Sequence, residues 1–125
     1  MNQVLLIATG GALGAVARHG LASLVNNQLD SRFPLGTLVV NVIGSLIIGI
    51  MYVVIIERLS LHPDWRNIIS IGFLGAFTTF STFSLEMVQL LEQGQLLTAG
   101  LYLMCSILSC IMLCWAGIII TRSLI

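Results

Sequence analysis

Four apolar segments, each long enough to cross a lipid bilayer, take up most of this 125-residue chain. They cover residues 4–24, 36–56, 67–91 and 96–120, and a membrane-spanning helix needs about 20 mostly apolar residues. Only 8% of the residues are charged, against roughly 25% in an average soluble domain, which is too few to cover a water-facing surface. We therefore expect an all-α membrane protein with four transmembrane helices, built as a single transmembrane domain over residues 1–125.

The connections between the segments are short and polar: NNQLDSRFP, ERLSLHPDW and EQGQ. Pro34 predicts the start of the second helix, because proline suits the first helical turn. The sequence HPDW predicts the start of the third helix, with Asp64 as its N-cap. Gly94 predicts a tight turn between the third and fourth helices.

Charge gives a weak signal for orientation and for partners. Four spans place both termini on one side, together with Arg58, Arg66 and Arg122, whereas Arg32 and at most Arg18 lie on the other. Because orientation follows a Lys/Arg excess, an excess of one arginine leaves two interpretations: another signal sets the topology, or the chain inserts both ways and pairs head to tail. The zero net charge, with no lysine, argues against a nucleic-acid partner.

A four-helix unit is too small to surround a pathway by itself, so we expect an oligomer. Gly10 and Gly14 share GxxxG spacing, and Gly44, Ser45 and Gly49 give the second span a small face. Small residues of this kind allow close helix contact in lipid.

The stretch GFLGAFTTFSTFSLE, residues 72–86, places an unusual number of hydroxyls at membrane depth. Phenylalanines recur every three residues, and the hydroxyls between and beside them are Thr78, Thr79, Ser81, Thr82 and Ser84. One or two hydroxyls can bond to backbone carbonyls one turn back, but five supply a ladder of donors. Because the edge of a phenyl ring is positive, the combination predicts an anion path without a full positive charge.

The same stretch predicts an interruption of the third helix near the bilayer midplane. Gly72, Gly75 and the pair Thr78-Thr79 all weaken a helix. Backbone carbonyls freed in a membrane must be satisfied, and a cation can satisfy them, as in transporters with broken helices. Oxygen-only ligation indicates a hard ion such as Na⁺.

Four polar residues at or near membrane depth each have two interpretations. Arg18 is either a functional buried charge or a side chain that reaches the interface, and His19 beside it is either interfacial or a ligand. Asn41 either holds helices together by a hydrogen bond or donates from a pore wall. Glu86 is either an interfacial carboxylate or a group at a pathway mouth.

Three cysteines, Cys105, Cys110 and Cys114, all fall in the fourth span. Their odd number and the lack of a CxxC pair argue against a disulfide framework or a zinc site. Helix packing is the simpler interpretation.

Three segments in matching order resemble the Fluc/CrcB family of fluoride channels: GGALGAVAR, PLGTLVVN and GFLGAFTTFSTFSLE. The resemblance covers nearly the whole chain, and the third segment is highly specific. It implies a multi-pass channel, not an enzyme, in a bacterial plasma (inner) membrane. Such a channel passively exports fluoride and so lowers its cytoplasmic concentration. The resemblance also implies an antiparallel, dual-topology homodimer in the lipid bilayer, with two fluoride pores.

The resemblance further implies roles for individual residues. A structural Na⁺, which is not transported, is held at the dimer centre by the backbone carbonyls of Gly75 and Thr78. The positions that match the fluoride pathway are Asn41, Phe80, Phe83, Ser81, Thr82, Arg18 and Glu86.

The fourth span departs from the family pattern. Family members often carry Ser and Thr one turn apart on the pore wall, and here Cys110 and Cys114 stand at those positions. The two cysteines share a helix face, but a thiol is a weak donor. We count both in the pathway, together with Ser109, which with Ser106 could replace the missing hydroxyls in part.

Two other functions fit a four-span chain less well. A proton-coupled drug exporter needs a carboxylate in its first span, and residues 4–24 contain no Asp or Glu. A structural or assembly subunit would use the hydroxyls only for helix packing. Ion flux through the purified protein distinguishes the channel from the assembly subunit.

Overall fold

The computed structural model of the protein describes residues 2–29 and 33–125, and the four predicted spans are present in it. They run over Asn2–Gln28, Leu35–Arg58, Pro63–Glu92 and Leu96–Leu124, and all four are long and apolar enough to cross a membrane. Each is longer than predicted, because helical hydrogen bonding continues into the polar residues at the ends.

The first and last spans are continuous α-helices, α1 (Asn2–Gln28) and α6 (Leu96–Leu124). The second span begins as α2 (Leu35–Met51) and finishes as a π-helical segment, η1 (Tyr52–Arg58). The third consists of α3 (Pro63–Trp65), the π-helical η2 (Arg66–Leu74), α4 (Gly75–Phe77) and α5 (Ser81–Glu92).

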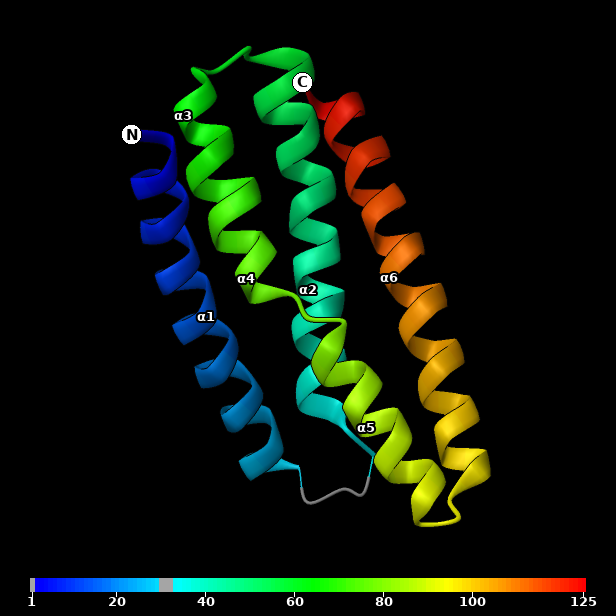
Figure 1. The fold of residues 1–125 in the computed structure, drawn as a ribbon. Helices are drawn as coiled ribbons and strands as arrows, with labels where there is room; N and C mark the ends of the chain where they lie inside the picture. Colours follow the sequence, from blue (N-terminus) through cyan, green and yellow to red (C-terminus); the bar gives the residue numbers. More distant parts are fainter. Residues whose placement is uncertain (1, 30–32) are drawn as a thin grey trace.

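Both termini lie at the same end of the bundle, as four spans require (Figure 1). Arg58 and Arg122 meet at this end, where Arg58 Nη2 donates to the Arg122 carbonyl over 3.3 Å. Arg122 also pairs with Glu57, with its Nε 2.8 Å from Glu57 Oε2. Arg32, which the sequence predicts on the opposite side, lies outside the described residues.

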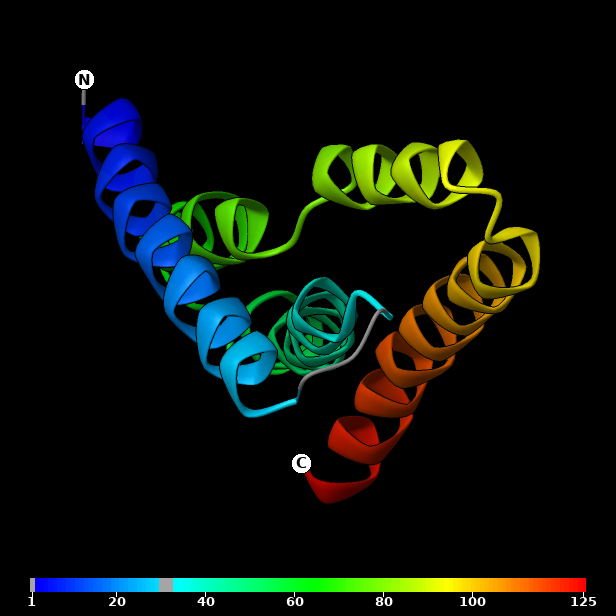
Figure 2. The same ribbon diagram turned by 90° about the horizontal axis from the view of Figure 1, so that it is seen from below.

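The helices form two groups joined through α2. Helix α1 packs against η2, α4 and α2, whereas α6 packs against α2 and α5. Figure 2 shows the consequence: the first half of the third span lies beside α1, and α5 is displaced toward α6. The third span therefore crosses from one helix group to the other.

The GxxxG face of α1 is used inside the chain. A Cβ on Gly14 would lie 2.1 Å from the Phe73 carbonyl oxygen, and one on Gly10 would lie 2.2 Å from that of Ile68. Gly72 faces the same contact, since its Cβ would lie 2.7 Å from the Ile7 carbonyl. These glycines let the backbones of α1 and η2 touch, which is how small residues stabilise helix pairs in lipid.

Two turn predictions have different outcomes. Gly94 has φ +74°, the left-handed conformation that favours glycine, so the tight-turn prediction is confirmed. The prediction of Asp64 as the N-cap is wrong: His62 is the N-cap, and its side chain accepts a 3.3 Å hydrogen bond from the Asp64 N–H. Pro63 already occupies the first helical position, which places Asp64 inside the first turn.

Candidate functional site

The helical hydrogen bonding of the third span stops between α4 and α5. Phe77 is the last residue of α4, Thr78 has an extended backbone (φ −83°, ψ 157°), and α5 begins at Ser81. Gly75 itself remains helical, so the change of direction falls after the glycines, at the two threonines. β-Branched residues are less favourable in a helix than in extended backbone.

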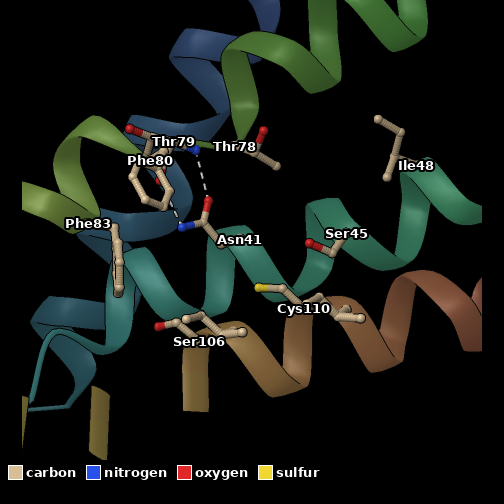
Figure 3. A pocket seen from close by; sticks show the side chains of 11 residues that line it. Asn41, Ser45, Ile48, Thr78, Thr79, Phe80, Phe83, Ser106 and Cys110 are labelled. Carbon is tan, nitrogen blue, oxygen red and sulfur yellow. Dashed lines mark hydrogen bonds between the residues drawn. The ribbon is translucent and has the colours of Figure 1, made fainter. Parts of the chain in front are cut away.

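Asn41 on α2 caps this interruption. Its Oδ1 accepts from the Thr79 N–H over 2.8 Å, and its Nδ2 donates to the Thr79 carbonyl over 3.0 Å (Figure 3). The side-chain amide thus replaces two backbone partners that the interrupted helix no longer supplies. Thr79 adds a local cap, since its Oγ1 accepts from the Thr82 N–H over 3.1 Å.

A hollow of about 350 Å³ lies beside the interruption, between α2, the Thr78–Phe80 segment, α5 and α6. Its wall is mostly apolar with a few polar groups, as expected of a small-solute site. The residues that line it are Asn41, Ser45, Ile48, Thr78, Thr79, Phe80, Phe83, Ser106, Ile107, Cys110 and Ile111 (Figure 3). Four residues predicted for the pathway therefore meet here: Asn41, Phe80, Phe83 and Cys110.

Phe80 and Phe83 lie in very different surroundings. Their ring centroids are 5.5 Å apart with the planes inclined by 48°. Phe83 is 6% exposed and packs on Tyr102, with centroids 5.0 Å apart in an edge-on arrangement. Phe80 is 77% exposed, so its other face is free to meet lipid or another chain. Phe83 is fixed by its neighbours, and Phe80 is not.

One face of α6 carries Ser106, Cys110 and Cys114, which are four residues apart in the sequence. Ser106 and Cys110 line the main hollow, and Cys114 lines an adjoining hollow with Ser45 and Cys110. Ser106 is only 7% exposed, and its Oγ has no hydrogen-bond partner among the described residues. Ser109 is placed elsewhere: its Oγ donates to the Cys105 carbonyl, and it lines a separate surface hollow with Leu108 and Met112.

Arg18 and Thr82 line a second, smaller hollow of about 180 Å³. Arg18 Nε donates to the Ala76 carbonyl at the end of α4 over 3.0 Å, so the charge bonds to the third span. His19, Thr37 and Thr79 complete the polar part of this wall. Thr79 belongs to both hollows, and the interrupted segment therefore separates them.

Ser81 and Glu86 lie off the main hollow. Ser81 is exposed, with its Oγ 3.4 Å from Thr79 Oγ1. Glu86 Oε1 accepts a 3.2 Å hydrogen bond from the Tyr102 hydroxyl, and Tyr102 is fully buried. The sequence patterns did not predict Ser45 or Tyr102 as residues of the site. Tyr102 could have been noticed as a lone tyrosine in an apolar span. A buried tyrosine hydroxyl needs a hydrogen-bond partner, which indicates a polar neighbour inside the protein.

The described residues contain no group of three or more His, Cys, Asp or Glu that could hold a metal ion. The interrupted backbone offers different ligands, since no donor from a described residue bonds to the carbonyl oxygens of Gly75 and Thr78. The neighbouring carbonyls are bonded: Leu74 accepts from Thr78 and Ala76 accepts from Arg18. Two free carbonyls fit a hard cation by chemistry, although one chain alone supplies too few of them.

Four bilayer-length helices, one of them interrupted beside a mostly apolar hollow with a few polar groups, define a multi-pass membrane protein. Residues 5–118 match the family described as CrcB-like protein, Camphor Resistance (CrcB). The chain belongs to this family, which confirms the resemblance carried by the three motifs.

Curated relatives agree over nearly the full length. A protein of Coxiella burnetii (strain CbuK_Q154) is 45% identical over 98% of this chain and 99% of its own. One from Nitratidesulfovibrio vulgaris is 47% identical over 94% of this chain and 95% of its own. One from Geobacter sp. (strain M21) is 43% identical over 99% of this chain and 100% of its own. Each is named a fluoride-specific ion channel FluC.

Proposed function

We propose that this protein is a fluoride-specific ion channel that passively exports fluoride. The observation that carries the proposal is the full-length similarity to channels of that name, which reaches 45% identity over 123 residues in the Coxiella protein. The geometry supports it independently, because donors without full charge surround the hollow. The drug-exporter alternative is disfavoured by the absence of Asp and Glu from residues 2–28.

The proposed path runs along the main hollow between α2 and α6. Thr79, Ser45 and Ser106 offer hydroxyls, and the ring edges of Phe80 and Phe83 offer weakly positive hydrogens. A small anion that leaves water needs such donors, but a full positive charge would bind it too tightly to let it leave. Arg18 lies in the second hollow and is held by the Ala76 carbonyl, so it attracts anions toward the path without standing in it.

The Asn41 amide has two roles in this proposal. Without fluoride it caps Thr79, using its carbonyl oxygen as acceptor and one N–H as donor. One N–H of its NH₂ group bonds to the Thr79 carbonyl, and the amide has a second. That second hydrogen is the donor offered to fluoride, so capping and conduction use different atoms of one side chain.

The functional unit in this proposal is an antiparallel, dual-topology homodimer with a structural Na⁺ that is not transported. The free carbonyls of Gly75 and Thr78 support it, since a second copy would raise the number of oxygens from two to four. The exposed Phe80 ring supports an interface on this side of the chain. The near balance of arginines supports insertion in both directions.

The proposed benefit is a lower fluoride concentration inside the cell. Hydrogen fluoride is a weak, uncharged acid, so it crosses lipid from acidic surroundings and ionises at the higher internal pH. The ion cannot return through lipid, because a bare charge in hydrocarbon is strongly unfavourable. A passive path that accepts fluoride therefore lets the trapped ion leave.

Fluoride efflux from liposomes containing only the purified protein tests the function. An ionophore balances charge, a fluoride electrode records release, and empty vesicles and chloride-loaded vesicles serve as controls. Rapid fluoride release with little chloride release is expected. Release no faster than from empty vesicles would rule out the channel and favour a structural subunit.

A further inference from the structure

The thiols of Cys110 and Cys114 form a feature that the transport of fluoride does not explain. Cys110 lines the main hollow with Asn41, Phe83 and Ser106, and Cys114 lines the adjoining hollow with Cys110 itself and Ser45. Figure 3 shows Cys110 between α6 and α2, close to Ser45. All three cysteines are free, and none is paired in a disulfide.

The spacing of the two cysteines suits a single two-coordinate ion. Residues four apart on an α-helix have Cβ atoms about 5–6 Å apart. A metal–thiolate bond is about 2.3 Å long, so a linear S–metal–S unit spans about 4.6 Å. Because α6 is continuous across both positions, two sulfurs can reach one ion by rotating side chains alone.

The surroundings favour a soft ion over a hard one. The residues that line the two hollows include no carboxylate or imidazole, whereas thiolates select soft metals. Ser106 Oγ lies one turn from Cys110 on the same wall, is nine-tenths buried and has no partner among the described residues. This part of the wall therefore borders space that a ligand can enter. Cys110 lines both hollows, and Cys114 lines the adjoining one.

Charge selects among the soft ions. Two thiolates balance the charge of one divalent cation, so the adduct with Hg²⁺ is neutral. A monovalent ion such as Ag⁺ would leave one negative charge in a low-dielectric site, which is unfavourable. Each thiol gives up its proton on binding: two S–H bonds break, two S–Hg bonds form, and two protons pass to water without any oxidation or reduction.

We propose that Cys110 and Cys114 form a soft-cation site in the wall of the path, where Hg²⁺ binds both sulfurs and closes the path to fluoride. Closure is expected because Cys110 lines the main hollow together with Asn41 and Phe83, so an ion bound to its sulfur would occupy part of the path. The binding half of this proposal is independent of the proposed function, and the closure half rests on it. Cys105 provides a matched control, since it lines a different hollow with Met104 and Leu108.

The first experiment measures binding without transport. Mercuric nitrate is titrated into purified protein in chloride-free detergent buffer, and the ultraviolet absorption of the S–Hg bond and the released protons are recorded. Wild type is expected to take up more than one ion per chain, because the exposed Cys105 is itself a free thiol. The pair is therefore titrated in Cys105→Ser, where one tightly bound ion and two released protons per chain are expected. Removing a group that only hydrogen-bonds to a metal ligand usually weakens metal binding 10–100-fold. Adding Cys110→Ser or Cys114→Ser to Cys105→Ser removes a direct ligand, so it is expected to weaken Hg²⁺ binding at least about 100-fold. Tight binding that survives when Cys110→Ser and Cys114→Ser are both added to Cys105→Ser, or the lack of tight binding in Cys105→Ser itself, overturns the site.

The second experiment measures closure in liposomes. Mercuric nitrate is expected to slow fluoride efflux at least about tenfold in wild type and Cys105→Ser, and dithiothreitol to restore it. Each variant is compared with its own rate before mercury, and Cys110→Ser is expected to be insensitive. Stoichiometric binding with unchanged efflux would place the thiols outside the path and overturn closure. If no protein conducts even without mercury, the proposed function fails, and the titration alone decides the site.

Discussion

Replacing Asn41 with leucine would test how the interrupted span is held together. Leucine branches at Cγ as asparagine does but removes both hydrogen bonds to Thr79, of 2.8 and 3.0 Å. A buried donor or acceptor left without a partner costs about 1–3 kcal/mol, so two cost about 2–6 kcal/mol. Asn41 and Thr79 are half-buried and border a hollow, where water can reach them, so we expect the lower end, about 2 kcal/mol.

Hydrogen exchange of the Thr79 amide is the most direct assay of this loss. A change of about 2 kcal/mol corresponds to roughly a 30-fold change in an equilibrium, so the Thr79 amide in Asn41→Leu should exchange about 30 times faster in detergent. The midpoint of thermal unfolding should fall as well. Ser45→Ala is the matched control, because Ser45 lies one turn further along α2 and borders the same hollow without capping Thr79.

A second substitution separates capping from conduction. Asn41→Asp keeps an acceptor for the Thr79 N–H but places a negative charge on the proposed anion path. We expect Thr79 to keep most of its protection while fluoride efflux is lost. Unchanged Thr79 exchange in Asn41→Leu would refute the capping argument, and undiminished efflux in Asn41→Asp would remove Asn41 from the path.

Packing and ion ligation lead to three further predictions. Gly14→Ala should destabilise the protein by at least about 2 kcal/mol in a thermal or denaturant assay, because the new Cβ would lie 2.1 Å from the Phe73 carbonyl oxygen. Gly20→Ala is the control: its Cβ meets nothing within 4 Å, so the change should be neutral or slightly stabilising. Equal effects of the two substitutions would contradict the α1–η2 contact. Phe83→Ala should cost about 3 kcal/mol or more, because Phe83 is only 6% exposed within its own chain. Phe80→Ala should cost less, because Phe80 is 77% exposed in the single chain, where it has few contacts to lose, and a larger loss could come only from contacts with a second copy. Both substitutions should reduce efflux, and an unchanged efflux rate would remove the ring-edge argument. Replacing Na⁺ by a large organic cation should lower the unfolding temperature, since saturation at 100 times the Kd contributes about 2.7 kcal/mol; an unfolding temperature independent of Na⁺ would exclude the proposed structural ion.

Predictions from sequence were best where a single periodicity or composition decided the outcome. The four spans follow from runs of apolar residues, because lipid leaves a chain of this composition few other solutions. The turn at Gly94 follows from one residue's conformational freedom. The N-cap of the third span was predicted wrongly at Asp64. The fixed φ of Pro63 suits the first helical position, which places the cap one residue earlier, at His62.

The candidate site shows more clearly which residues could not be placed from the sequence alone. The family resemblance assigned Asn41, Phe80, Phe83 and Cys110 to one path, and the structure brings all four to one hollow. It places Ser109 on another face of α6, Ser81 at the surface and Thr82 in the second hollow. Neighbouring hydroxyls look alike in a sequence, whereas on a helix each successive residue turns to a new face.

The sequence by itself determined that this chain lies in a membrane as four helices and that its third span carries a row of hydroxyl side chains. Those properties depend on composition and local spacing, and they do not require any particular contact between helices. Only the tertiary structure decided what Asn41 bonds to, since Thr79 is 38 residues away in the chain. It also decided that Gly14 serves contact with η2 and that Ser106 faces a hollow without a partner among the described residues. Such outcomes depend on which backbone atoms from distant segments meet, and that is fixed by packing among the helices.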